Sequence, residues 1–166
     1  RLAEQSPEAA LPVLTFNGSM SFHLNGEEAH IIPVPPAHTD GDSIIYFEDS
    51  DVLHAGDMFR TIAFPVIDLN NGGSLDGTID ALGLVAGLAG PNTRIVPGHG
   101  VVSTREDVIE FRDMVSDVKA RVTTLVERGL SYNEVAAANP TAAYNAKWGD
   151  PERFLRAVYA ELGGED

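Results

Sequence analysis

The segment Ser43–Phe47 limits most strongly what this chain can fold into. Its central residues Ile44, Ile45 and Tyr46 make both faces of the predicted β-strand apolar, whereas a strand with one solvated face alternates apolar and polar residues. Such a strand needs a packed layer on each face. With one face uncovered, it would expose an apolar patch of the kind that marks an interface or an aggregation hazard.

Tight turns join this segment to further predicted strands. Asn17-Gly18 and Asn25-Gly26 are typical hairpin turns, and the prolines at 33, 35 and 36 end the third strand because proline cannot donate to a sheet ladder. These signals indicate a three-stranded meander followed by shorter strands. The predicted strands cover residues 11–16, 19–24, 27–34, 43–47, 52–55 and 93–97.

Four helices are predicted from capping residues and apolar periodicity. Ser74 caps the first, which Gly90-Pro91 ends, and Thr104 caps the longest, which Gly129 ends. A capping box at residues 131–134 starts a third helix, and Asp150-Pro151 opens the last one. Between strands and helices, residues 60–73 form a long loop. We expect its apolar residues 64–67 to shape a pocket, because long loops inside a domain are usually functional.

Composition excludes several classes of function. The 166 residues include 11 Lys+Arg and 25 Asp+Glu, a net charge of −14, which disfavours nucleic acid as a partner because phosphate contacts need clustered basic residues. There is no cysteine, and therefore no disulfide, thiolate nucleophile or Cys-ligated metal. No apolar run approaches the roughly 18 residues of a membrane span. Both a cytoplasmic and an exported location stay open.

The ends of the chain suggest how it is organised. It begins with Arg1 instead of Met, and residues 1–10 resemble the remnant of a preceding segment. We therefore expect that an original N-terminus was lost by processing, by design or by cleavage. Residues 1–166 are predicted to form a single domain, in which residues 131–166 are a C-terminal helical extension.

Three side chains are candidates for metal binding or catalysis because they follow predicted strands. His38 and His99 lie in loops flanked by Gly or Pro, and Asp57 follows Gly56. Strand ends gather ligands at one edge of a sheet, and two imidazoles with a carboxylate suit a divalent metal ion. Each residue alone has a simpler interpretation, namely a solvated histidine or a turn aspartate. The other three histidines, His23, His30 and His54, lie inside predicted strands, and His54 is favoured as a surface residue.

The motifs that contain these residues resemble the last three metal motifs of the metallo-β-lactamase superfamily, most closely its glyoxalase-II-like hydrolases. They are residues 37–42 (Ala-His-Thr-Asp-Gly-Asp), 53–59 (Leu-His-Ala-Gly-Asp-Met-Phe) and 95–100 (Ile-Val-Pro-Gly-His-Gly). The resemblance covers about residues 12–130. It implies an α+β fold, the αββα sandwich of that superfamily, of which this chain supplies the C-terminal β-sheet layer and its covering helices.

The resemblance also implies roles at the site. His38 is similar to the third imidazole of the first metal site, Asp57 to the carboxylate that bridges two metals, and His99 to the imidazole of the second. Asp57 is then the catalytic residue in a bridging and orienting role and not the nucleophile. The implied cofactor is zinc, as two ions, with iron or manganese as alternatives. Asp40 and Asp42 are expected to orient His38, although Asp42 equally suits a plain turn residue.

The superfamily's His-x-His-x-Asp-His motif is absent from this sequence, since no two histidines are two positions apart. The three candidates alone would give each metal at most two protein ligands, whereas catalytic zinc usually has three. We therefore expect a missing N-terminal half, or a second copy of the chain, as a partner.

Two functions remain open. The first is a hydrolase that uses metal-activated water on a small ester, thioester or lactone-like substrate. The second is a non-catalytic half-domain, an assembly module with a vestigial metal site.

Overall fold

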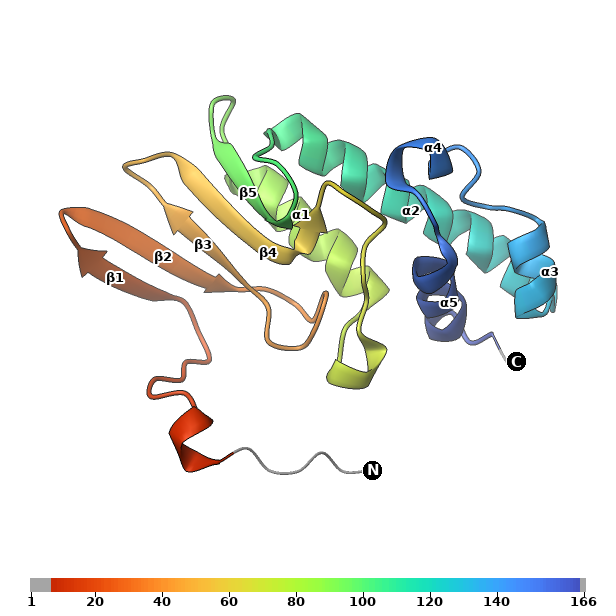
Figure 1. The fold of residues 1–166 in the computed structure, drawn as a ribbon, viewed down its shortest axis with the longest axis horizontal. Helices are drawn as coiled ribbons and strands as arrows, with labels where there is room; N and C mark the ends of the chain where they lie inside the picture. Colours follow the sequence, from red (N-terminus) through yellow and green to blue (C-terminus); the bar gives the residue numbers. More distant parts are fainter. Residues whose placement is uncertain (1–6, 165–166) are drawn as a thin grey trace.

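A five-stranded sheet and two long helices form most of the computed structural model, which describes residues 7–164 (Figure 1). The strands are β1 (Met20–Leu24), β2 (Glu27–Pro33), β3 (Ser43–Phe47), β4 (Val52–Arg60) and β5 (Arg94–His99). The helices are α1 (Leu75–Leu88), α2 (Arg105–Glu127), α3 (Tyr132–Ala137), α4 (Asn145–Trp148) and α5 (Glu152–Glu161), with short 3₁₀ turns η1 (Glu8–Ala10) and η2 (Leu69–Asn71). Of residues 7–164, no helix is long and apolar enough to cross a membrane.

The strands follow one another in the sheet in chain order. β1 to β4 pair antiparallel, and β5 pairs parallel with β4 after the α1 crossover. The Asn25-Gly26 turn is confirmed, since both residues have the positive φ that a tight hairpin requires. The parallel pairing of β4 and β5 is important for the site because it brings the ends of both strands to one edge.

Two strand predictions need correction. Residues 11–16 form no strand, and Val13 is 98% exposed, because Pro12 lacks an N–H group and nothing pairs with this segment. β4 runs to Arg60 instead of ending at Ala55, because Gly56 takes φ +56° and the strand continues past this irregularity. The expected remnant at residues 1–10 lies partly outside the described residues, since 1–6 are not described.

The two faces of the sheet differ in burial. The face toward α1 and α2 contains Ile44, Leu53 and Ile95, all with 0% exposure. The side chains between these residues along the strands point to the opposite face, and no apolar side chain is buried there. The apolar residues of that face are Met20, Phe22, Leu24, Ala29, Ile31, Ile45, Phe47, Val52 and Val96. We call this set the open face. The strand Ser43–Phe47 is thus covered by helices on one side only within residues 7–164.

The predicted helix starts are confirmed. Ser74 accepts a hydrogen bond from the N–H of Gly77, and Thr104 forms a capping box with Asp107. The capping box at Ser131 starts α3, and α5 follows Pro151. The short helix α4 was not predicted.

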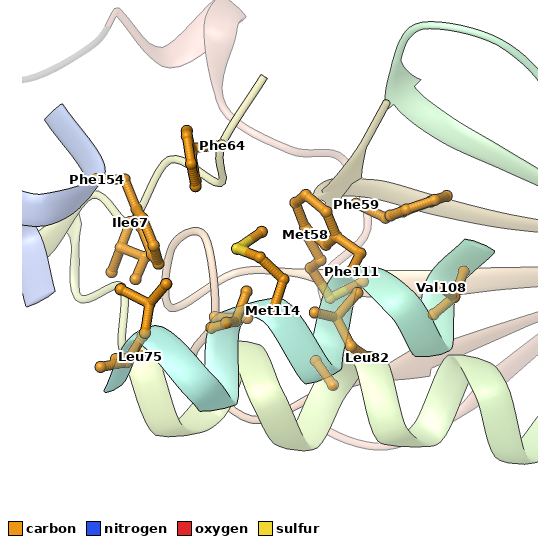
Figure 2. Packing of buried hydrophobic residues seen from close by; sticks show 14 of the residues in the cluster. Met58, Phe59, Phe64, Ile67, Leu75, Leu82, Val108, Phe111, Met114 and Phe154 are labelled. Atoms are coloured by element: carbon orange, nitrogen blue, oxygen red, sulfur yellow. The ribbon is translucent and has the colours of Figure 1, made fainter. Parts of the chain in front are cut away.

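Aromatic stacking positions the C-terminal helices against the core. Phe111 of α2 packs edge-on against Phe59 of β4 and against Trp148 of α4, with ring centroids 5.4 and 5.0 Å apart. Phe64, in the loop after β4, stacks on Phe154 of α5 at 5.5 Å, and both rings are buried (Figure 2). The loop and α5 are therefore fixed to each other, next to the strand ends.

Candidate metal centre

The three predicted site residues lie together at one edge of the sheet. Nε2 of His99 is 3.2 Å from Oδ1 of Asp57, and Nε2 of His38 is 3.9 Å from Oδ2 of the same carboxylate. Each imidazole thus faces a different oxygen of Asp57. Two ligand atoms about 2.1 Å from one tetrahedral metal ion are about 3.4 Å apart, so the His99 spacing is close to that of shared coordination and the His38 spacing is about 0.5 Å wider.

His38 lies in the loop after β2, and its ring is held by the loop after β4. Its Nδ1–H donates to the carbonyl oxygen of Val66 at 2.7 Å, which leaves the Nε2 lone pair directed toward Asp57. The carbonyl of His38 in turn accepts from the N–H of Asp68 at 2.9 Å. The expectation that Asp40 or Asp42 orients this imidazole is replaced by the Val66 contact. Asp42 is a turn residue that accepts from the N–H of Thr39.

Glycines allow the other two residues to approach each other. Asp57 follows Gly56, whose positive φ redirects β4, and a Cβ on Gly98 would overlap the Asp57 carboxylate. His99 ends β5, and its carbonyl accepts from the N–H of Thr61 at 3.0 Å. Gly98 is thus required because the Asp57 side chain occupies the space that any other residue would need.

The side chains of this cluster differ in solvent access. His38 is 21% exposed, Asp57 45% and His99 56%. All three line a pocket of about 270 Å³, whose lining residues are His38, Asp57, Arg60, Val66, Asp68, His99 and Arg153. His54, the surface residue of the sequence analysis, is not among them, and its Nδ1 accepts from the N–H of Gly56.

Asp68, Arg60 and Arg153 are pocket residues that sequence reasoning did not find. The long loop at residues 60–73 was expected to shape a pocket through its apolar residues 64–67. Of these only Val66 lines the pocket, and Arg60 and Asp68 of the same range line it as well. Hydrogen bonds from Asn71 lower the pKa of Asp68, so its carboxylate stays ionised. Arg153 gave no sequence signal, since it reaches the pocket only through the packing of α5.

The side chains at this site are of the types that bind metal ions, but too few of them lie together to complete a site. Imidazole nitrogens and a carboxylate are the ligands that zinc and similar ions prefer. Within residues 7–164, however, no group of three or more His, Cys, Asp or Glu side chains is arranged to hold one ion. His38 and His99 share only Asp57, which would give two ions two ligands each from this chain. These three side chains alone therefore fall short of a complete metal site.

Fold and site together define a class, namely an α+β protein whose sheet edge gathers imidazoles and a carboxylate in one pocket. A family model described as the metallo-beta-lactamase superfamily matches residues 6–99, more than half of the chain. The chain belongs to this superfamily, whose members are generally metal-dependent hydrolases. No curated protein sequence gives a match.

Solved structures share the fold. The sec-alkylsulfatase Pisa1 from Pseudomonas sp. aligns with 93% of this chain and 27% of its own, at 18% identity and a TM-score of 0.73. A metallo-β-lactamase family protein from Thermus thermophilus, TTHA1429, aligns over 90% and 47% at 19% identity and a TM-score of 0.66. TTHA1623, solved in a di-iron-bound form, aligns over 63% and 50% at 22% identity and a TM-score of 0.51. The chain thus spans half or less of each of these proteins.

Proposed function

We propose that this chain contributes His38, Asp57 and His99 to the two-metal site of a hydrolase that acts on an ester, thioester or lactone-like substrate. One observation supports this most directly: a single carboxylate lies between two imidazoles, one from the loop after β2 and one from the end of β5, at 3.9 and 3.2 Å. Zinc is the proposed metal, with iron or manganese as alternatives, and a glyoxalase-II-like hydrolase is the proposed subclass. When bound, such ions supply Lewis acidity and activate water near neutral pH.

The chain's own residues orient the proposed metal ligands and line the pocket. The Nδ1–H of His38 is occupied by the Val66 carbonyl, so the imidazole is kept in the tautomer that presents Nε2. Asp57 offers one oxygen to each imidazole, and its proposed role is to hold and orient the ions and not to act as the nucleophile. The loop that contains Val66 is fixed to α5 through the Phe64–Phe154 stack and forms part of the pocket wall.

The remaining ligands are proposed to come from a segment that packs on the open face. Phe22 is 42% and Leu24 71% exposed there, in a strand that has no layer on this side within residues 7–164. Apolar patches of this kind mark interfaces. The proposed partner is an N-terminal half of the same domain or a second copy of this chain.

A second function is favoured by the absence of a three-ligand group within residues 7–164. In this alternative the chain is a non-catalytic half-domain, and its assembly through the open face is the whole function. Metal binding would then be weak or absent.

Zinc titration of the chain, read by bound-metal analysis and by thermal denaturation, separates the two functions. We expect bound zinc and a higher melting temperature, both lost in His99→Ala, because that variant removes an imidazole that faces Asp57. His23→Ala is the matched control, since His23 is an exposed imidazole on β1 outside the pocket. Zinc that neither binds nor shifts the melting temperature would contradict the hydrolase proposal. Sedimentation velocity on the same samples detects a second copy.

A further inference from the structure

The loop that orients His38 is held at both of its ends by helix α5. This loop begins after β4 and leads into α1, and Phe64 near its start stacks on Phe154 in the first turn of α5. At the other end of the loop, Glu161, the last residue of α5, is hydrogen-bonded to Ser74. Phe154 and Glu161 are about two helical turns apart and therefore lie on the same face of α5. One helix thus fixes both ends of one loop.

Glu161 makes two hydrogen bonds at the start of α1. Its Oε1 accepts from the hydroxyl of Ser74 at 2.9 Å, and its Oε2 accepts from the N–H of Leu75 at 2.6 Å. The first N–H groups of a helix have no partner within the helix, and the helix dipole favours a negative charge there. Because this carboxylate belongs to a different helix, it caps α1 and also ties α1 to α5.

The start of α1 is in direct contact with the backbone next to His38. The N–H of Ser74 donates to the carbonyl oxygen of Ala37 at 2.9 Å, and Ala37 is fully buried. A Cβ on Gly77, in the first turn of α1, would overlap the carbonyl group of Pro36. Since the two segments touch without spare room, a displacement of the start of α1 would displace His38 as well.

Two contacts from the same loop set the direction of the His38 ring. The Val66 carbonyl accepts from the Nδ1–H of His38 at 2.7 Å, and the N–H of Asp68 donates to the His38 carbonyl at 2.9 Å. The carbonyl of Asp68 in turn accepts from the N–H of Gly73, the residue before the N-cap of α1. The orientation of the imidazole therefore depends on a loop whose last residues are anchored by α5.

We propose that Glu161 is a positioning residue for the candidate metal centre: by anchoring the start of α1, it keeps the His38 imidazole in the orientation that directs Nε2 toward Asp57. Glu161 is not among the residues that line the pocket, so it acts through Ser74 and the loop. The role of His38 as a metal ligand rests on the function proposed above, whereas the orientation of its ring by Glu161 does not. A carboxylate that only capped α1 would affect stability alone.

The tautomer of His38 in the metal-free chain tests this inference. NMR spectra that correlate ring nitrogens with ring protons, recorded in EDTA at about pH 8, distinguish an imidazole protonated only at Nδ1 from one that exchanges between both tautomers. We expect the His38 signals, assigned by their loss in His38→Gln, to show the Nδ1–H form in the unchanged chain. In Glu161→Ala we expect this form to be lost and the signals to resemble those of the exposed His23. Glu161→Gln, which keeps one oxygen acceptor, should retain most of the Nδ1–H form.

Glu134→Ala is the matched control. The carboxylate of Glu134 also accepts from a serine hydroxyl and a backbone N–H at the start of a helix, but that helix is α3, which contributes no residue to the pocket. Both variants should lower the melting temperature by about 2–4 °C, the shift that loss of one cap produces in a domain of this size. Circular dichroism confirms that each variant is folded. A His38 tautomer that is unchanged in Glu161→Ala, or lost equally in Glu134→Ala, overturns the inference.

Zinc titrations of the same proteins separate this outcome from failure of the hydrolase proposal. A changed His38 tautomer in Glu161→Ala, together with no zinc binding by the unchanged chain, keeps the positioning role and removes only the proposed metal function. Zinc binding by the unchanged chain, together with an unchanged His38 tautomer in Glu161→Ala, removes only the positioning role.

Discussion

Replacing Gly98 by alanine tests whether the close contact between β4 and β5 positions the Asp57 carboxylate. A Cβ at position 98 would overlap Oδ1 of Asp57 and lie 2.8 Å from the carbonyl carbon and oxygen of Gly56, whereas ordinary contacts begin near 3.4 Å. Since the Gly56 backbone is part of a paired strand, it cannot move away freely. Overpacking of this kind costs about 1–3 kcal/mol. For a chain of this length that corresponds to a melting temperature about 2–12 °C lower.

The same substitution is expected to weaken zinc binding. The Asp57 carboxylate must rotate away from the new methyl group, and metal ligands tolerate displacements of only about 0.2 Å. We expect an affinity about 10–100-fold lower, as for other changes that misorient a ligand, measured by competition with a chelator of known affinity.

Gly83→Ala is the control for the Gly98 variant. Gly83 is a helical glycine in α1, and a Cβ there meets no atom within 4 Å. It should raise stability by about 0.5–1 kcal/mol and leave zinc binding unchanged. If Gly98→Ala behaves like Gly83→Ala in both assays, the reasoning about Asp57 is refuted.

Two further predictions concern stability. Gly77→Ala should lower the melting temperature more than Gly98→Ala. The new Cβ would overlap the carbonyl group of Pro36 and force α1 away from the loop after β2. Equal melting temperatures of the two variants would contradict this. Tyr144 donates to Asp117 at 2.7 Å, and this hydrogen bond raises the pKa of the Tyr144 phenol above its ordinary 10.0. The bond therefore stabilises the fold fully below about pH 10, and this contribution is lost as the pH rises through the raised pKa. The melting temperature, measured from about pH 8 to 11, should show a decline that Tyr144→Phe lacks. The same decline in both proteins would refute the assignment.

Helix boundaries could be predicted because the signals that set them lie within one turn. Ser74, Thr104 and Ser131 each cap a helix through groups no more than three residues away. The strand predicted at residues 11–16 was wrong for the opposite reason. Strand formation depends on a partner, and a short run of strand-forming residues beside a turn cannot show whether one is present.

The site was only partly predictable. His38, Asp57 and His99 could be proposed because each follows or ends a strand, and the structure brings them together. The group that orients His38 could not be predicted, because the Val66 carbonyl comes from a loop 28 residues further along the chain. Arg153 reaches the pocket through the stacking of two phenylalanines, a tertiary contact that no local pattern encodes.

Helix α5 has a consequence for the order of events during biosynthesis. It places Arg153 in the pocket, and at its other end the Glu161 carboxylate accepts hydrogen bonds from Ser74 and from the N–H of Leu75 at the start of α1. The nascent polypeptide must therefore emerge from the ribosome almost to Glu161 before these pieces can dock. Binding of a ligand in the pocket should then require α5. A protease that cuts the chain before α5 should abolish this binding even though the sheet remains folded.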